Sequence, residues 1–272
     1  MRRRSAVQLL PALALLLLLV WGVSWWQARP TPVALDGYHV AVYREGRGSP
    51  VVVFESGLSG GIESLRPLQD QLAEHTETLS YERAGFDRSD HVPQPRTAEE
   101  IARELDELLG RLGIDSPVVL ACYSAGCFYS RVFAHEYPQA VAALVLIDPA
   151  PAAPYAALAK SHGAVWAAQR NALSKRGREE WDALPQTLAQ LERASTPVTV
   201  PVLLITALKP SGAWPVASRA DMNAWLRGDQ QMLAQFGVAT HVILPQATHR
   251  SVIADPEVAK AILQLIGRQR VQ

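Results

Sequence analysis

Short apolar runs alternate with amphipathic stretches along most of this chain. The apolar runs predict strands, two within 38–57 around a glycine-rich turn and others at 78–85, 117–124, 141–148, 200–207 and 240–246. Between them, apolar positions recur about once per helical turn, which predicts helices at 62–75, 97–113, 125–138, 216–236 and 256–266. Continuous apolar strands suit a parallel sheet that is buried on both faces. We therefore expect an α/β fold with a mostly parallel, twisted sheet flanked by helices.

The helix at 97–113 has the clearest boundary signals. Thr97 is a good N-cap residue, Glu100 follows three residues later, and a glycine stands at the end. We expect this helix to begin directly after Thr97.

Residues 150–197 interrupt the alternation. This segment is rich in alanine, has helical periodicity and contains Tyr155, Trp166 and Trp181. Insertions between strands of an open sheet commonly form lids over active sites. We expect a small helical cap here, inserted after the sixth strand.

The N-terminal residues are typical of a membrane-targeting segment. Three arginines at 2–4 precede an apolar stretch over 6–26, which is long enough to cross the hydrocarbon core of a bilayer as a helix. No small-x-small processing site follows the stretch, so we expect a retained signal anchor and not a cleaved signal peptide. Because the basic end stays in the cytoplasm, the rest of the chain is expected to be exported, and so periplasmic or extracytoplasmic. If the segment is cleaved, the domain is secreted.

The chain thus divides into a targeting segment over 1–27, a linker over 28–35 marked by Pro30 and Pro32, and one domain over 36–272. The 272 residues are 49% hydrophobic and 19% charged, with a formal net charge of zero, as in a globular domain with a sizeable core. No surplus of basic residues is available to bind nucleic acid, so no such partner is expected. The sequence leaves the oligomeric state open.

The stretch "ACYSAG" at 121–126 places Ser124 between a predicted strand and a predicted helix. So tight a turn requires small residues two positions before and after the serine, and Cys122 and Gly126 meet that requirement. The turn would lift the hydroxyl of Ser124 above the edge of the sheet, as a nucleophile needs. A serine that merely caps the helix is the alternative interpretation of this stretch alone.

A hydroxyl nucleophile needs a base that accepts its proton at neutral pH. Of the seven histidines, His249 closes a strand-to-loop sequence near the C-terminus, "HVILPQATHR". His241 begins the same strand and is expected at the opposite edge of the sheet. His249 is therefore the candidate base, and a histidine in a surface loop is the alternative.

An oxyanion hole is indicated by "VVVFESGLSGG", an apolar strand that ends in a glycine-rich loop. The backbone amide of Leu58 is the candidate donor from this loop, and the amide of Ala125, directly after the nucleophile, is the second. A simple turn is the other interpretation of the glycines.

An acid is needed to orient the histidine and to stabilise its protonated form. Asp148 directly ends the predicted strand that follows the helix of the nucleophile, so it should lie at the same edge of the sheet. Asp221 is the alternative, since the strand ending at Ala207 is followed by no earlier carboxylate. Asp221 and Asp229 both fall within a predicted helix and are expected to be solvated surface charges.

The chain resembles the α/β-hydrolase superfamily over nearly all of 36–268. The resemblance rests on "VVVFESGLSG", "YERAGFDRSD", "ACYSAG", "LVLIDPA" and "ATHRSVIADPEVAKAI" and on the order Ser, Asp, His along the chain. It implies Ser124 as the nucleophile, His249 as general base and acid, and the amides of Leu58 and Ala125 as the oxyanion hole. The sequence departs from the family pattern at Cys122, which replaces a glycine, and in having no acid directly after the predicted strand that ends at Ala207.

Three further features concern the surroundings of the site. The loop "YERAGFDRSD" is expected to form a wall of the site, with Arg83 paired to a nearby carboxylate. Cys122 and Cys127 flank the nucleophile turn and are expected as small buried side chains; a disulfide is the alternative, because an exported domain could oxidise them. No spacing typical of a metal site occurs, and we expect neither a metal nor another cofactor.

These observations predict a membrane-anchored serine hydrolase that cleaves an ester or related acyl bond of a small molecule through a covalent acyl-enzyme. Two alternatives stay open. One is a domain of the same fold that binds a ligand or a protein without turnover, and the other is a hydrolase that acts on amide or C–C bonds. Epoxide chemistry normally needs an aspartate at the position of Ser124.

Overall fold

The computed structural model describes residues 29–93, 95–161, 163–194, 199–211, 219–237 and 239–269. The expected signal anchor lies outside these residues. Among the helices that are described, none is both long and apolar enough to cross a membrane.

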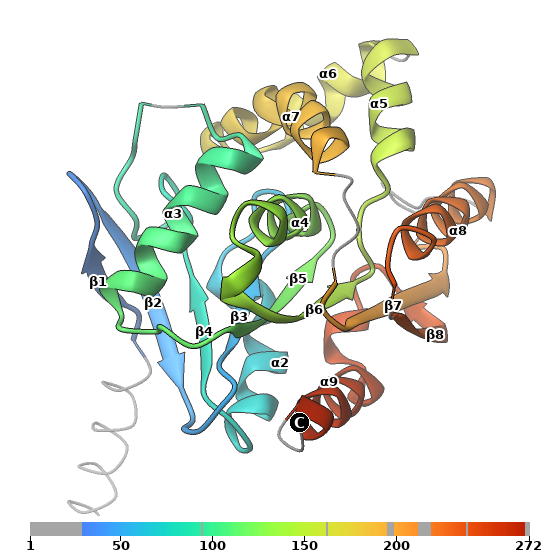
Figure 1. Cartoon of the computed structure of the whole chain (residues 1–272). Helices are drawn as coiled ribbons and strands as arrows, with labels where there is room; N and C mark the ends of the chain where they lie inside the picture. The colour runs from blue at the N-terminus through green and yellow to red at the C-terminus, as the bar shows by residue number, and fades with distance from the viewer. Residues whose placement is uncertain are drawn as a thin grey trace, which may run out of the picture.

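The described residues form one twisted sheet of eight strands in the order β1-β2-β4-β3-β5-β6-β7-β8 (Figure 1). β1 pairs with β2, and β2 with β4, in antiparallel fashion; all pairs from β4 through β8 are parallel. The strands are β1 (Thr31–Ala34), β2 (His39–Glu45), β3 (Val52–Glu55), β4 (Thr78–Tyr81), β5 (Val118–Tyr123), β6 (Val141–Ile147), β7 (Val202–Lys209) and β8 (Ala239–Thr248). The predicted fold class is confirmed.

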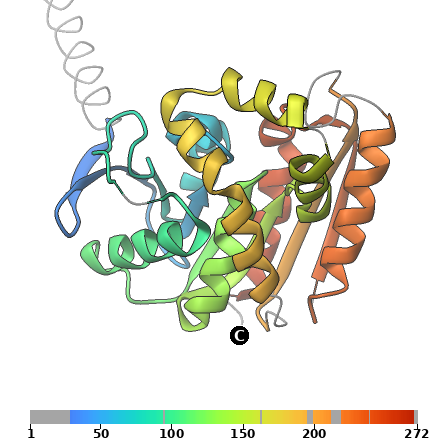
Figure 2. The ribbon, with the colours of Figure 1, turned by 90° about the horizontal axis from the view of Figure 1, so that it is seen from above.

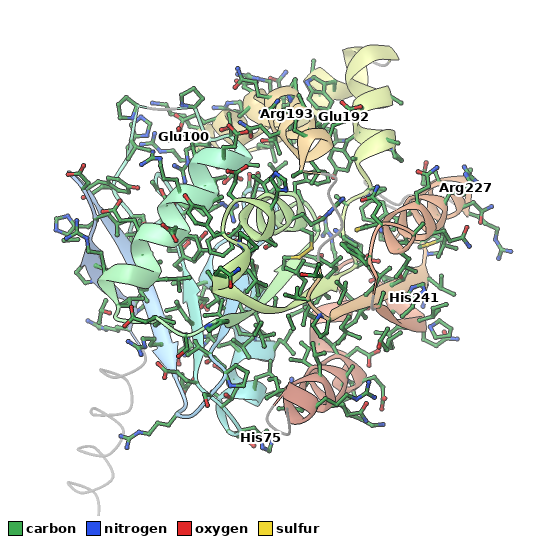
Figure 3. All side chains as sticks on the ribbon, viewed as in Figure 1. His75, Glu100, Glu192, Arg193, Arg227 and His241 are labelled. Carbon is green, nitrogen blue, oxygen red and sulfur yellow. A yellow bond between two sulfur atoms is a disulfide. The ribbon has the colours of Figure 1, made fainter. Side chains whose placement is uncertain are left out.

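Helices cover both faces of this sheet, and side chains fill the spaces between the layers (Figures 2 and 3). They are α2 (Ile62–Ala73), α3 (Ala98–Arg111), α4 (Gly126–Glu136), α5 (Ala152–Ser161), α6 (Gly163–Ala172), α7 (Lys175–Arg193), α8 (Arg219–Leu233) and α9 (Pro256–Gln269). Short 3-10 turns lie at η1 (Pro138–Ala140) and η2 (Val252–Ala254). The apolar faces of α2 and α9 pack on one side of the sheet, and those of α3, α4 and α8 pack on the other.

The strand β5 shows how the sequence produces these two cores. Its apolar residues alternate between the faces of the sheet, with Leu120 and Cys122 in the core under α4, and Val119 and Ala121 in the core under α2 and α9. All four side chains are fully buried. A central strand of this kind has no polar face, which is why its sequence reads as a continuous apolar run.

The predicted cap is present as α5, α6 and α7, between β6 and β7, and it lies above α4 (Figure 1). The helix start at Thr97 is also confirmed, since its hydroxyl accepts a hydrogen bond from Glu100 N. One strand was missed: residues 31–34, expected within the linker, form the edge strand β1. Pro32 suits an edge strand, because it has no N–H to donate to a further neighbour.

Candidate active site

Ser124 lies in the turn between β5 and α4, at the carboxyl edge of the parallel strands. Its φ is +56°, in the left-handed region that non-glycine residues rarely adopt. Two hydrogen bonds hold this backbone: Ser124 N donates to Ile147 O at 3.2 Å, and Ala150 N donates to Ser124 O at 3.0 Å. The strained turn is thus fixed by β6 and by the chain that follows it.

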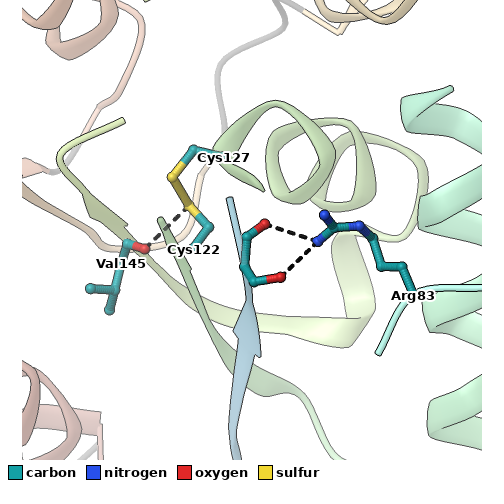
Figure 4. Close-up of a disulfide and its surroundings, with 5 residues drawn as sticks. Arg83, Cys122, Cys127 and Val145 are labelled. Carbon is teal, nitrogen blue, oxygen red and sulfur yellow. Dashed lines mark hydrogen bonds between the residues drawn. A yellow bond between two sulfur atoms is a disulfide. The ribbon is translucent and has the colours of Figure 1, made fainter. Parts of the chain in front are cut away.

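The small residues around Ser124 are needed for close packing. A Cβ built on Gly126 would lie 2.3 Å from Ser56 O, so only glycine fits there. Cys122 takes the place of the usual first glycine and is bonded to Cys127 (Figure 4). The expectation of two free thiols was wrong: the turn brings the two Cα atoms to 5.0 Å, within disulfide range. The contact of Cys122 Sγ with Val145 O at 3.4 Å is not a hydrogen bond, because a disulfide sulfur carries no hydrogen.

The structure brings Ser124, His249 and Asp148 together in one chain of contacts. His249 Nε2 lies 2.9 Å from Ser124 Oγ, and His249 Nδ1 lies 2.6 Å from Asp148 Oδ2. All three residues are buried, at 8% exposure for the serine and the histidine and 1% for the aspartate. They come from the ends of three different strands, which meet at one edge because those strands are parallel.

Asp148 is positioned as firmly as the serine. Its φ is +43°, its N–H donates to Ile205 O at 2.7 Å, and its Oδ1 accepts from Ala207 N at 3.0 Å. The other carboxylate oxygen is thereby left to accept a hydrogen bond from His249 Nδ1–H. That tautomer leaves the lone pair on Nε2, which faces the hydroxyl of Ser124.

Two aromatic side chains enclose the ring of His249. Tyr123 stacks on it with the centroids 4.9 Å apart, and Trp225 on α8 approaches edge-on at 5.3 Å. The Tyr123 hydroxyl also donates to His249 O at 2.6 Å. Burial raises the pKa of Tyr123 well above its usual value, so this hydroxyl stays protonated. Tyr123 therefore fixes both the ring and the backbone of His249.

The candidate oxyanion-hole amides lie beside Ser124. Ala125 follows Ser124 at the N-terminus of α4, and a Cβ built on Gly57 would lie only 3.2 Å from Ser124 Cβ. Among the hydrogen bonds of the described residues, none uses the backbone N–H of Leu58 or of Ala125. Both donors are thus available to an external acceptor.

Arg83, in the loop after β4, donates hydrogen bonds to Ser56, in the segment that leads from β3 to Leu58 (Figure 4). Its Nη1 donates to Glu55 Oε1 at 2.5 Å and to Ser56 O at 2.9 Å, and its Nη2 donates to Gly57 O at 2.9 Å. The guanidinium also bonds both carboxylate oxygens of Glu180 on α7, at 2.6 and 3.1 Å. The expected pairing of Arg83 with a carboxylate is confirmed, with two partners instead of one.

This arrangement fixes the orientation of the peptide between Gly57 and Leu58. Gly57 O accepts from Arg83 Nη2 and also from Gly60 N at 2.9 Å. In a trans peptide the C=O and the N–H point in opposite directions, so the N–H of Leu58 is directed away from Arg83.

The charges around Arg83 are buried almost completely. Glu55, Arg83 and Glu180 are each at most 1% exposed. Burial raises the pKa of Glu55 to about 7, and Arg83 and the hydroxyl of Tyr81 limit that rise. One cation thus serves two carboxylates, one of which titrates near neutrality.

Other predicted residues lie away from this chain of contacts. Asp221, the alternative acid, is exposed in the first turn of α8. Asp229 was expected on the surface but is fully buried, because its face of α8 packs against β7; it accepts a hydrogen bond from Thr206 Oγ1 at 2.7 Å. His241 Nε2 lies 2.8 Å from the same hydroxyl, near the start of β8.

Glu180 and Tyr123 were not singled out as parts of the site. Tyr123 directly precedes the serine, so its position could have indicated a neighbour of the base. Glu180 lies 97 residues from Arg83 in a helix with ordinary surface periodicity, and no local signal indicates the pairing.

Comparisons with known proteins agree with the fold. A family model described as alpha/beta hydrolase fold matches residues 50–190. YqjL of Bacillus subtilis, an uncharacterized protein, is 26% identical over 127 residues, which are 47% of this chain and 50% of YqjL. The chain spans half or less of each curated relative that it matches.

Two solved structures cover most of the chain. A thermophilic esterase from Thermogutta terrifontis has a TM-score of 0.62 and 20% identity, covering 89% of this chain and 99% of the esterase. The enol-lactonase from Burkholderia xenovorans LB400 has a TM-score of 0.61 and 18% identity, covering 89% of this chain and 100% of the lactonase. At these identities the likeness shows a shared fold.

Proposed function

This chain belongs to the α/β-hydrolase family, and we propose that it is a serine hydrolase that cleaves an ester or a related acyl bond of a small molecule. The observation that carries the proposal is the buried, hydrogen-bonded chain from Ser124 through His249 to Asp148. A serine that only capped a helix would need neither a base at 2.9 Å nor a carboxylate behind that base.

In the first half of the reaction, Ser124 Oγ attacks the carbonyl carbon while His249 Nε2 takes the hydroxyl proton. The carbonyl oxygen becomes an oxyanion and accepts hydrogen bonds from the amides of Leu58 and Ala125. When the tetrahedral intermediate collapses, the bond to the leaving alkoxide breaks and His249 gives that alkoxide the proton. Ser124 is then acylated.

In the second half, His249 takes a proton from a water molecule, whose oxygen attacks the acyl carbon. The same two amides stabilise the second oxyanion. Collapse releases the carboxylic acid and returns the proton to Ser124 Oγ. Throughout, Asp148 holds the imidazole and stabilises its cationic form, while its second oxygen stays bound to Ala207 N.

An ester-type bond is favoured for two reasons. A serine nucleophile forms an acyl-enzyme that water can hydrolyse, whereas epoxide opening on this fold normally uses an aspartate. An esterase and an enol-lactonase also share the fold over most of this chain, and both names describe cleavage of a C–O acyl bond.

Replacing Ser124 by alanine tests the proposal. The full chain should hydrolyse p-nitrophenyl butyrate and become labelled by a fluorophosphonate, and Ser124→Ala should lose both. Ser130→Ala is the matched control, since Ser130 is a buried serine on α4 whose hydroxyl has no partner among the described residues. Labelling of Ser124→Ala at the rate of the parent, or absence of labelling in the parent itself, would refute the assignment.

The role of Asp148 is tested by a pair of variants. Asp148→Asn should lower kcat by roughly 10⁴-fold, because an amide at this position favours the wrong tautomer of the histidine. Asp221→Asn should keep the activity of the parent, since Asp221 is exposed. The reverse result would assign the role of the acid to Asp221 on α8.

We also propose that residues 1–27 anchor the hydrolase domain on the outer side of the membrane. The arginines at 2–4 and the apolar stretch over 6–26 support this topology. The pair Cys122–Cys127 fits it, since disulfides persist in oxidising compartments. Alkaline phosphatase fused after the domain should be active, and GFP fused there should be dark; the opposite pattern excludes export.

A further inference from the structure

A cavity separate from the Ser124 site lies between α4, the start of α5, α7 and α8. Its volume is about 680 Å³, within the range of roughly 300–1,000 Å³ that is usual for small-molecule sites. The described residues that line it do not include the serine, histidine, aspartate or amides discussed above. Its apolar wall is formed mainly by Pro151, Ala152, Ala156, Leu188 and Met232.

The cavity contains a cation that has no counter-ion among the described residues. Arg131 projects from α4, and its Nη2 donates to the side-chain oxygen of Gln235 at 2.7 Å. No carboxylate of the described residues lies within ion-pair distance of Arg131, in contrast to the two carboxylates around Arg83. Burial lowers the pKa of Arg131 to about 10, and its other contact is with the ring of Phe236, whose centroid lies 6.0 Å from Cζ.

A half-buried arginine that has no carboxylate partner among the described residues, beside an apolar wall, is complementary to an anion with an apolar body. The guanidinium presents N–H groups in a planar fork that matches a carboxylate. The cavity also has the exposed carboxylate of Glu192 on its α7 side, where Figure 3 labels it. A single arginine facing this negative charge favours a monoanion over a doubly charged phosphate.

We propose that this cavity is a binding site for a monocarboxylic acid with an apolar chain or ring, bound through Arg131. The acid would place its carboxylate against the guanidinium and Gln235, and its apolar body against α5 and α7. The inference is independent of the hydrolase reaction, since Ser124, His249 and Asp148 are not among the described residues that line the cavity.

Fluorescence titration of the full chain with dansyl-undecanoic acid tests the site. The parent should bind one probe per chain in a saturable manner, and decanoate should displace it better than decanol or decyl phosphate. Arg131→Gln should weaken probe binding about 10-fold or more, as expected for loss of a charge-assisted hydrogen bond. Arg131→Lys keeps the positive charge but lacks the planar set of N–H donors. Its affinity for the probe should therefore lie between the affinities of the parent and of Arg131→Gln.

Three controls place the binding in this cavity. Ala189→Trp adds bulk from an exposed lining position of α7 and should block the probe without disturbing the core. Arg227→Gln removes an exposed charge on α8 outside the lining, marked in Figure 3, and should bind as the parent does. Labelling Ser124 with a fluorophosphonate should leave the titration unchanged.

The proposal fails if the parent shows no saturable binding, or if decanol competes as well as decanoate. It also fails if Arg131→Gln binds the probe as tightly as Arg227→Gln does. Stronger displacement by decyl phosphate than by decanoate would assign the site to phosphates and overturn the choice of a carboxylate.

Discussion

Replacing Glu180 by glutamine tests whether the cap orients the oxyanion-hole loop. Glu180 accepts hydrogen bonds from Arg83 Nε at 2.6 Å, from Arg83 Nη2 at 3.1 Å and from Ser59 N at 3.1 Å. Glutamine has almost the same size, but it is neutral and offers only one acceptor oxygen. The guanidinium should then lose its fixed orientation toward Gly57 O, on which the direction of the Leu58 N–H depends.

The expected size of the effect follows from the bonds that remain. Complete loss of one oxyanion-hole donor lowers kcat by roughly 10²- to 10³-fold. Gly57 O keeps its bond from Gly60 N, so we expect a smaller loss, about 10- to 100-fold in kcat. KM should change by less than about 3-fold, because the amide acts on charge that develops only in the transition state. Arg83 keeps Glu55 as a partner, so stability should fall by only about 1–3 kcal/mol.

The assay is the initial rate of p-nitrophenyl butyrate hydrolysis, with active sites counted by fluorophosphonate labelling so that unfolded protein does not contribute. An aryl boronic acid, which mimics the tetrahedral intermediate, should bind more weakly by the same factor as kcat. Glu179→Gln is the matched control, since Glu179 directly precedes Glu180 on α7 and its Oε1 lies 3.2 Å from Arg176 Nη1. A kcat of Glu180→Gln within 2-fold of the control, with full labelling, contradicts the reasoning.

Three further predictions concern the surroundings of the site. Tyr123→Phe removes the hydrogen bond to His249 O and should lower the free energy of unfolding by about 0.5–1.5 kcal/mol in urea denaturation, with KM unchanged; a shift above 4 kcal/mol would indicate repacking instead. Replacing Cys122 and Cys127 together by alanine opens a loop of sequence separation 5 and should cost about 2 kcal/mol of stability, whereas an unchanged melting temperature would mean that the thiols are not bonded. Burial raises the pKa of Asp229 to about 7, above its unfolded value, so the folded protein binds this proton more tightly and loses stability as the pH rises from about 4 to 7. Asp229→Asn should make that slope shallower in thermal melts, while Glu55, whose pKa is also raised to about 7, keeps its own share of it; a slope as steep as that of the parent would refute this cause.

The parts of the site that could be predicted share one physical rule. Ser124, Asp148 and His249 each follow a strand of a parallel sheet, and the carboxyl ends of parallel strands lie at one edge. Apolar runs mark such strands in the sequence, so the residues that follow them can be assigned to that edge without knowing the strand order. The same rule assigned His241, which begins a strand, to the opposite edge.

The parts that could not be predicted depend on rotations and distances between elements. Whether Asp229 is solvated depends on how α8 is turned about its axis, and whether Cys122 and Cys127 meet depends on how closely the helix follows the strand. The pairing of Arg83 with Glu180 depends on where the cap rests. Periodicity determines which face of a helix is apolar, but it does not indicate which buried polar residue finds a partner.

Backbone strain links the fold to the proposed chemistry. Of the four non-glycine residues with positive φ in the described chain, Ser59, Ser124 and Asp148 belong to the site or to the loop beside it. Each such conformation costs of order 1–3 kcal/mol and persists only where the surroundings fix it. Ser124 and Asp148 are held by hydrogen bonds to β6, β7 and the chain between them, and Ser59 is held by Glu180 from the cap. The first two constraints belong to the sheet and survive as long as the fold does. The constraint on Ser59 is lost when α7 moves, because Glu180 lies on that helix. A displacement of the cap should therefore impair the proposed oxyanion hole while leaving Ser124, His249 and Asp148 in contact.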